Sequence, residues 1–134
     1  MKSDFSGEYV LNRPASTLGS GAAGVESGVV RIEHRDPVFR YWATFAADGK
    51  TILEYSFELL TDGPAVALGE NETSRLYWQG DALVTEHRSV TTDPVVKMSW
   101  RYELIDGGRC LRATEQIRGV GRDQTNVWVF ERHE

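Results

Sequence analysis

The feature of this sequence that most limits its fold is a series of short runs in which apolar and polar residues alternate, each ending at a turn signal. Period-two alternation is typical of strands with one buried face, and closely spaced turns are typical of all-β sandwiches and barrels. The turn signals are Asp36-Pro37, Asp48-Gly49, Asp62-Gly63, Gly80-Asp81, Asp93-Pro94, Asp106-Gly107-Gly108 and Gly119-Val120-Gly121. The pattern predicts about ten strands, over residues 5–11, 29–35, 38–46, 51–60, 65–68, 72–79, 82–91, 95–105, 110–119 and 123–132.

The chain has 134 residues, which suits a single domain over residues 1–134. About ten strands with one apolar face need a cover for that face, and the sequence offers few helices to provide it. A sheet that closes on itself covers the face and removes its exposed edges. The predicted fold class is therefore all-β, a single antiparallel up-and-down β-barrel of about 8–10 strands with room for a small ligand.

The longest stretch without strand pattern is 12–28, where Gly19, Gly21, Gly24 and Gly28 occur among small residues. Four glycines make a long helix unfavourable. We expect a loop with at most one helical turn near residues 15–18. A connection of this length in a small domain is often a lid, so a lid is our hypothesis for this segment.

The charge and composition limit the partners that this protein can have. The net charge of −5 argues against nucleic acid and gives no reason to expect attraction to anionic membranes. No apolar run approaches 18 residues, so membrane insertion is not expected. Cys110 is the only cysteine, so no internal disulfide can form, and no signal peptide is visible near Met1. We expect a cytoplasmic protein, monomeric or homodimeric, while an exported form stays open.

Hairpin registers indicate which side chains share a face, because a one-residue slip exchanges the two faces of a strand. We take Asp36-Pro37, Gly80-Asp81 and Asp93-Pro94 as two-residue loops, and 106–109 and 119–122 as four-residue loops. A three-residue loop over 47–49 would place Ala43 opposite Leu53. The five hairpins then put opposite charges on one face, with Glu33 facing Arg40, Arg75 facing Glu86, Glu86 facing Arg101, Glu103 facing Arg112 and Arg118 facing Asp123. The other face is mostly apolar, and we expect it to point inward.

The same registers place a polar row on the inward face, formed by Ser74, His87, Trp100, Glu115 and Asn126. Burying a carboxylate without partners is costly, so this row suggests a solvated cavity. Three hypotheses stay open: a ligand anchor, a general acid/base pair of His87 and Glu115, or a hydrated layer in which Glu115 bonds Asn126 and His87 bonds Ser74. The candidate ligand-binding residues are Tyr41, Tyr55, Ser74, His87, Trp100, Glu115, Asn126 and Trp128, and the candidate catalytic residues are His87 and Glu115.

No metal or nucleotide motif is present. The three histidines lack metal-ligand spacing, and His34, at a hairpin end, is expected at the barrel rim. We expect no cofactor, although haem stays open because one axial histidine needs no motif. No Gly-x-Ser-x-Gly, phosphate loop or dinucleotide fingerprint occurs.

Two motifs at opposite ends of the chain carry a family resemblance. Gly7-x-Tyr9 in the first strand and Arg132 in the last resemble the pattern of the calycin superfamily, which includes lipocalins and fatty-acid-binding proteins. In that pattern a Gly-x-Trp packs beneath an arginine of the last strand, and this chain departs from it by having tyrosine. The sequence also looks like small bacterial lipocalin-like proteins that open with Phe-x-Gly-x-Trp and close with Phe-Glu-Arg. The resemblance implies a barrel closed at one end by Tyr9 and Arg132.

Calycins mostly bind small apolar molecules, so the resemblance implies a function of that kind. We expect non-covalent binding of a small, mainly apolar ligand inside the barrel cavity. The alternative is a small barrel enzyme doing isomerase- or lyase-type acid/base chemistry in the same cavity. A third hypothesis is an interaction module without a ligand. The arginine and tyrosine that hold the ligand carboxylate in fatty-acid-binding proteins are not clearly matched here.

Overall fold

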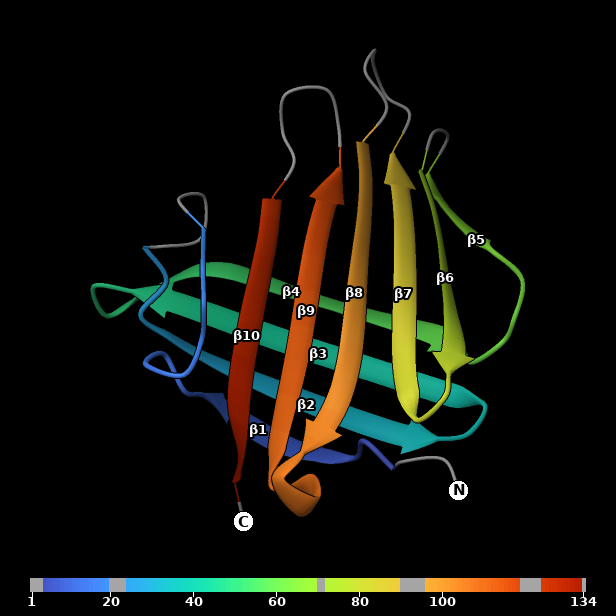
Figure 1. The fold of residues 1–134 in the computed structure, drawn as a ribbon. Coiled ribbons are helices and arrows are strands. Elements are labelled where there is room, and N and C mark those ends of the chain that lie inside the picture. The colour runs from blue at the N-terminus through green and yellow to red at the C-terminus, as the bar shows by residue number, and fades with distance from the viewer. Residues whose placement is uncertain (1–3, 20–23, 70–71, 90–95, 119–123, 134) are drawn as a thin grey trace.

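The structure is a computed structural model, and it describes residues 4–19, 24–69, 72–89, 96–118 and 124–133. These residues form one antiparallel sheet in the order β4-β3-β2-β1-β10-β9-β8-β7-β6-β5 (Figure 1). The strands are β1 (Gly7–Leu11), β2 (Ser27–Arg35), β3 (Val38–Ala47), β4 (Lys50–Leu60), β5 (Val66–Gly69), β6 (Glu72–Gln79), β7 (Ala82–Ser89), β8 (Val96–Ile105), β9 (Cys110–Arg118) and β10 (Gln124–His133). The expected strands and the all-β fold class are confirmed.

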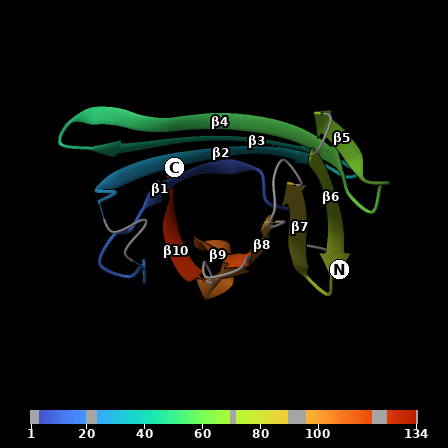
Figure 2. The same ribbon diagram turned by 90° about the horizontal axis from the view of Figure 1, so that it is seen from above.

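The sheet curls into a nearly closed barrel. Figure 2 shows β1 to β4 as one layer lying over the layer of β10 to β6. The two ends of the strand order, β4 and β5, do not pair within the described residues. Just beyond β4, Thr61 forms an isolated bridge to Leu76 of β6, and the Asp62 N–H donates to the Leu76 carbonyl at 2.8 Å. The predicted up-and-down barrel is therefore confirmed, with one incompletely paired seam.

Four of the predicted hairpin registers are confirmed. Glu33 lies opposite Arg40, Arg75 opposite Glu86, Glu103 opposite Arg112, and Ala113 opposite Trp128. The expected pair of Arg118 with Asp123 involves a residue outside the described part of the chain. These registers place the apolar faces inward, as the alternation predicts.

The register of β7 and β8 differs from the prediction by two residues. Glu86 lies opposite Ser99, so the expected pair with Arg101 is wrong, and the two-residue loop expected at Asp93-Pro94 lies outside the described residues. Glu86 instead pairs with Arg75 on its other side, with an N–O distance of 2.6 Å. A shift of two residues leaves every side chain on its predicted face, so the inward and outward sets are unchanged.

The β3–β4 hairpin also differs from the prediction. Ala43 lies opposite Tyr55 rather than Leu53, because the connection is a two-residue turn and a bulge follows Phe45. The turn residues Asp48 and Gly49 both have positive φ, 52° and 74°, as a tight type I′ hairpin requires. Leu53 lies opposite Phe45 and is 51% exposed, so it does not belong to the core.

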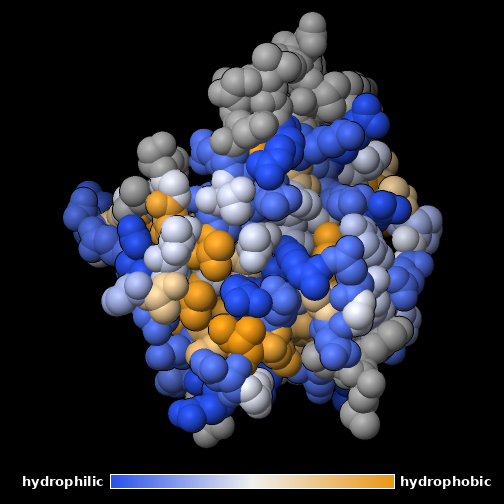
Figure 3. All heavy atoms as spheres, viewed as in Figure 1, coloured by the Kyte–Doolittle hydropathy of each residue, from blue (hydrophilic) through white to orange (hydrophobic). Residues whose placement is uncertain are grey.

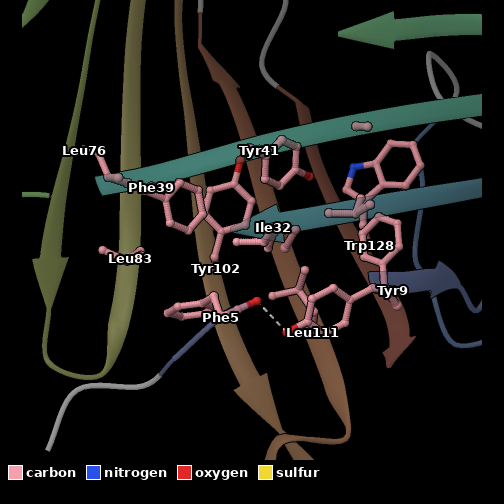
Figure 4. Packing of buried hydrophobic residues seen from close by; sticks show 14 of the residues in the cluster. Phe5, Tyr9, Ile32, Phe39, Tyr41, Leu76, Leu83, Tyr102, Leu111 and Trp128 are labelled. Carbon is pink, nitrogen blue, oxygen red and sulfur yellow. Dashed lines mark hydrogen bonds between the residues drawn. The ribbon is translucent and has the colours of Figure 1, made fainter. Parts of the chain in front are cut away.

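The core lies between the two layers and is rich in aromatic rings. Figure 4 shows Phe39 and Tyr41 of β3 and Tyr102 of β8 pointing toward one another in the interior. Tyr41 and Tyr102 have ring centroids 5.4 Å apart, and both are almost completely buried. The outer surface is mainly hydrophilic in the view of Figure 3, with smaller hydrophobic groups between the polar ones. No helix in the described part of the chain is long and apolar enough to cross a membrane.

Tyr9 and Arg132 meet at one end of the barrel, as the resemblance implies. The Arg132 guanidinium lies 5.4 Å from the centroid of the Tyr9 ring, and its Nη2 donates to the Tyr9 hydroxyl at 2.9 Å. The Tyr9 hydroxyl donates in turn to the Phe5 carbonyl at 2.8 Å (Figure 4). Gly7 has φ 147°, a backbone conformation that favours glycine. The Gly7-x-Tyr9 motif therefore supplies both the residue that this backbone conformation requires and the tyrosine ring that contacts Arg132.

The expectation that His34 lies on the rim is wrong, because the N-terminal segment covers it. His34 is buried, and its Nδ1 accepts a hydrogen bond from the Phe5 N–H at 3.2 Å. Its Nε2 lies 3.2 Å from Asp36 Oδ1, which also accepts from the Thr61 hydroxyl at 2.7 Å. This network fastens the N-terminal segment to the β2–β3 hairpin and closes that end of the molecule.

Residues 12–19 and 24–26 form an extended loop without a helical turn, as the expectation of at most one turn near residues 15–18 allows, and residues 27–28 begin β2. A turn over 13–15 is followed by an isolated bridge between Thr17 and Val127 of β10. The Asn12 N–H also donates to the Val129 carbonyl at 2.7 Å. Residues 12–19 therefore follow the upper part of β10, where β1 does not pair with it.

Candidate functional site

A buried polar group lies on the inner faces of β9 and β10. Glu115 lies opposite Asn126 in the ladder, and the inward alternation brings Trp128 next to them. All three side chains are buried. The Asn126 amide donates to Glu115 Oε1 at 2.9 Å, and the Trp128 indole N–H lies 3.4 Å from the same oxygen. The structure therefore brings together three of the predicted site residues around one carboxylate.

The carboxylate of Glu115 is only partly satisfied. Both hydrogen bonds go to Oε1, and no described residue donates a hydrogen bond to Oε2. No lysine or arginine forms an ion pair with Glu115 in the described residues. A buried carboxylate in this position needs further donors, because removing a charge from water without pairing it is costly. The site therefore has one acceptor oxygen open to a ligand or to water.

Three tyrosines form a cluster in the interior, and the Glu115 charge acts on two of them, Tyr55 and Tyr102. The Tyr41 ring stacks on Tyr55 with centroids 5.9 Å apart, and Tyr102 contacts Tyr41. The Tyr55 hydroxyl is buried and has no hydrogen-bond partner among the described residues. Burial raises the pKa of Tyr55 to about 12, with a smaller opposing effect of the nearby Tyr41 hydroxyl and a further upward effect of the Glu115 charge. At neutral pH the Tyr55 phenol is therefore a protonated donor without an acceptor.

Burial also raises the pKa of Tyr41 and of Tyr102 well above the usual value, and the Glu115 charge contributes to the pKa of Tyr102. The Glu115 charge raises the pKa of both Tyr55 and Tyr102, so the three side chains interact electrostatically. Tyr102 belongs to this group, although it is not among the candidate site residues predicted from the sequence. Its position two residues after Trp100 on the same strand is the signal that could have identified it.

Aromatic side chains form the walls around the polar group. Trp100 lies opposite Glu115 in the ladder and stacks on Tyr102 with centroids 6.3 Å apart. Phe45 packs against Trp128 with centroids 5.0 Å apart (Trp128 is labelled in Figure 4). Mostly apolar walls with a few convergent polar groups are typical of small-molecule sites.

Ser74 and His87 do not join this group. They lie opposite each other on β6 and β7, but the register shift places His87 opposite Met98. From strand spacing and residue rise, the Cα atoms of His87 and Glu115 are roughly 12 Å apart. Ser74, His87 and Met98 instead contribute to a separate pocket of about 520 Å³. Trp100, Glu115 and Asn126 therefore lie side by side as predicted. Ser74 and His87 also face each other, but they are displaced from the other three by the register between β7 and β8.

The segment before β2 reaches the same polar group. The Gly19 N–H donates to the side-chain carbonyl of Asn126 at 2.6 Å, while the Asn126 amide donates to Glu115. Asn126 thus connects the covering segment to the carboxylate. No group of three His, Cys, Asp or Glu side chains suited to a metal ion occurs within the described ranges.

No family model matches this sequence, and no curated protein sequence matches it. Solved structures do match over nearly the full chain. Human cRBP IV matches with a TM-score of 0.69 at 16% identity, covering 98% of this chain and 99% of its own. A mutant of the fluorescent protein UnaG matches with a TM-score of 0.67 at 16% identity, covering 97% of this chain and 96% of its own.

A fatty acid-binding protein from brain tissue of Drosophila melanogaster matches with a TM-score of 0.56 at 21% identity, covering 96% of this chain and 99% of its own. These identities are low, so the likeness concerns the path of the chain and not the residues of the site. It agrees with the single antiparallel sheet of the described residues. The chain has the calycin fold.

Proposed function

We propose that the barrel binds a small, mainly apolar molecule non-covalently, with one polar group of the ligand at Glu115. The observation that carries this proposal is the Glu115 carboxylate, which is buried among aromatic rings with one oxygen unbonded by the described residues. The unpartnered Tyr55 hydroxyl in the same environment supports it. The names of two solved structures of this fold, a fatty acid-binding protein and a fatty acid transporter, add support from outside the chain.

Catalysis by His87 and Glu115 has less support. A general acid and base must both reach the reacting group, within hydrogen-bond distance or through one water. These two residues lie on strands separated by β8 and are offset along the sheet. No other observation in the described residues favours a reaction over binding.

Titration with a neutral fluorescent probe tests the proposal. N-phenyl-1-naphthylamine gains fluorescence in apolar surroundings, so saturable 1:1 binding is expected. Replacing Trp100, which lines the site, by alanine should weaken binding roughly fivefold to tenfold, because stacking contact is lost. The matched control is Trp42→Ala, since Trp42 lies on the outer face, is 38% exposed and contacts Arg31. Absence of saturable binding, or equal loss in both variants, would overturn the proposal.

A further inference from the structure

The sign of the charge in the site restricts the ligand further. Resting on the proposed function, we propose that the Glu115 site takes an apolar molecule carrying an uncharged or cationic hydrogen-bond donor, such as an alcohol or an amine. The same site rejects carboxylates and other anions. The site selects among head groups because the buried Glu115 carboxylate, a negative charge, lies where the head group of the ligand would bind.

The acceptor character of the site comes from the free oxygen of Glu115. Asn126 and Trp128 both donate to Oε1, so the remaining oxygen calls for a donor from the ligand. An anionic head group has no proton to donate and would place a second negative charge beside the first. Two charges of the same sign repel at contact distance, and they repel more strongly in a buried site than in bulk water.

The charges of the described residues do not offset this repulsion. The inward arginine of β10, Arg132, is six residues beyond Asn126, roughly 20 Å along an extended strand. It is also engaged with the Tyr9 ring and hydroxyl and with the Ser6 carbonyl. Within the described residues, Glu115 has no ion-pair partner. A ligand anion would therefore meet the Glu115 carboxylate without a paired cation among the described residues.

The Tyr55 hydroxyl explains how the site suits an alcohol. It is a buried phenol without a partner in the described part of the chain, and it stays protonated at neutral pH. A ligand hydroxyl can donate to a carboxylate oxygen and accept from a phenol. An ammonium group can donate to Glu115 but cannot accept from Tyr55. Glu115 therefore discriminates against anionic head groups, and Tyr55 favours an alcohol over an ammonium group.

A series with one chain length and three head groups tests the inference. 1-Dodecanol, dodecylamine and dodecanoate compete with N-phenyl-1-naphthylamine at pH 7.5 and 150 mM salt. The alcohol and the amine should displace the probe, and dodecanoate should bind on the order of a hundredfold more weakly, as expected for an uncompensated like charge. Equal or tighter binding of dodecanoate by the unmodified protein would overturn the inference.

Variants assign the selectivity to the two residues. Glu115→Gln removes the charge with little change in shape, so dodecanoate should gain about tenfold and dodecylamine should lose about as much. Tyr55→Phe should weaken dodecanol severalfold and leave dodecylamine unchanged, and this variant also serves if Glu115→Gln does not fold. The matched control is Glu54→Gln, because Glu54 is exposed on the outer face of β4. An unchanged ranking in both site variants would overturn the inference.

The two proposals fail in different ways. If the probe itself shows no saturable binding, the proposed function fails and the selectivity fails with it. If the probe binds but the head groups are not ranked as expected, only the inference about the ligand class fails. Circular dichroism and thermal unfolding of each variant establish that the barrel is intact before the ranking is interpreted.

Discussion

Asn126 and Glu115 lie directly opposite each other on β10 and β9, and their side chains share a buried 2.9 Å hydrogen bond inside the barrel. The carbonyl of the same Asn126 side chain accepts from the Gly19 N–H at 2.6 Å. The Asn126 side chain thus donates one hydrogen bond to the Glu115 carboxylate and accepts one from the backbone of the covering segment.

Replacing this amide should destabilise the barrel. In Asn126→Ala, Glu115 loses a donor and the Gly19 N–H loses its acceptor, so the free energy of unfolding should fall by about 2–3 kcal/mol. Urea unfolding measures the loss. Gln116→Ala is the control, because Gln116 is exposed on the neighbouring outward position and should change stability by less than about 0.5 kcal/mol. Equal effects of the two variants would contradict the role given to Asn126.

The closed end makes a second prediction. Arg132→Met keeps the length of the side chain but removes two hydrogen bonds and the cation above Tyr9. We expect the free energy of unfolding to fall by about 2–3 kcal/mol. Arg132→Lys should recover part of the loss, since it keeps the cation. Urea unfolding of both variants is the measurement, and a lysine variant no better than methionine would show that charge is not involved.

Alkaline pH should destabilise the protein through its buried tyrosines. The pKa of Tyr55 is about 12 in the folded barrel, against about 10 in an unfolded chain. The folded state holds the proton more tightly, so its stabilisation is full below pH 10 and is lost as pH rises from about 10 to 12. Tyr55 accounts for a loss of about 2–3 kcal/mol by pH 12, and Tyr41 and Tyr102 act in the same direction.

Urea unfolding between pH 8 and pH 12 measures this slope. Tyr55→Phe should flatten it, because phenylalanine has no proton to lose. Tyr77→Phe should change it less, since Tyr77 is only partly buried and bonds Glu86 at the surface. A slope that Tyr55→Phe leaves unchanged would mean that the pH dependence has another origin.

His34 provides a prediction about the N-terminal segment. His34→Leu leaves the Phe5 N–H without its acceptor and Asp36 without one of its partners. The free energy of unfolding should fall by about 2–3 kcal/mol, and amide exchange near residue 5 should become faster. His133→Leu is the control, because His133 is exposed. If exchange at residue 5 is unaffected, the segment is held by other contacts.

Much of the fold follows from the sequence because strands and turns leave local signals. Alternation defines the inner face of each strand, and Gly80-Asp81 or the segment 106–109 leaves little choice of register. The β7–β8 pairing could not be settled in this way. A two-residue shift preserves both faces, and Glu86 had two attractive partners, Arg75 and Arg101, of which the barrel uses the first.

The placement of the candidate site residues was predicted in part for the same reason. The β9–β10 register was predicted correctly, so the positions of Glu115, Asn126 and Trp128 were too. The predicted position of His87 depended on the β7–β8 register, which was wrong. The burial of His34 could not be predicted at all, because it depends on a segment 29 residues earlier in the chain folding across it. Contacts between distant segments leave no periodic signal.

The seam between β4 and β5 has a mechanical consequence. A ring of strands that is hydrogen-bonded all the way round can change its girth only by breaking backbone ladders. Here the ends of the strand order are joined beyond β4 by the short contact of Thr61 and Asp62 with Leu76. The girth of the barrel can therefore change by repacking of side chains along that one line, while the nine strand pairings stay intact.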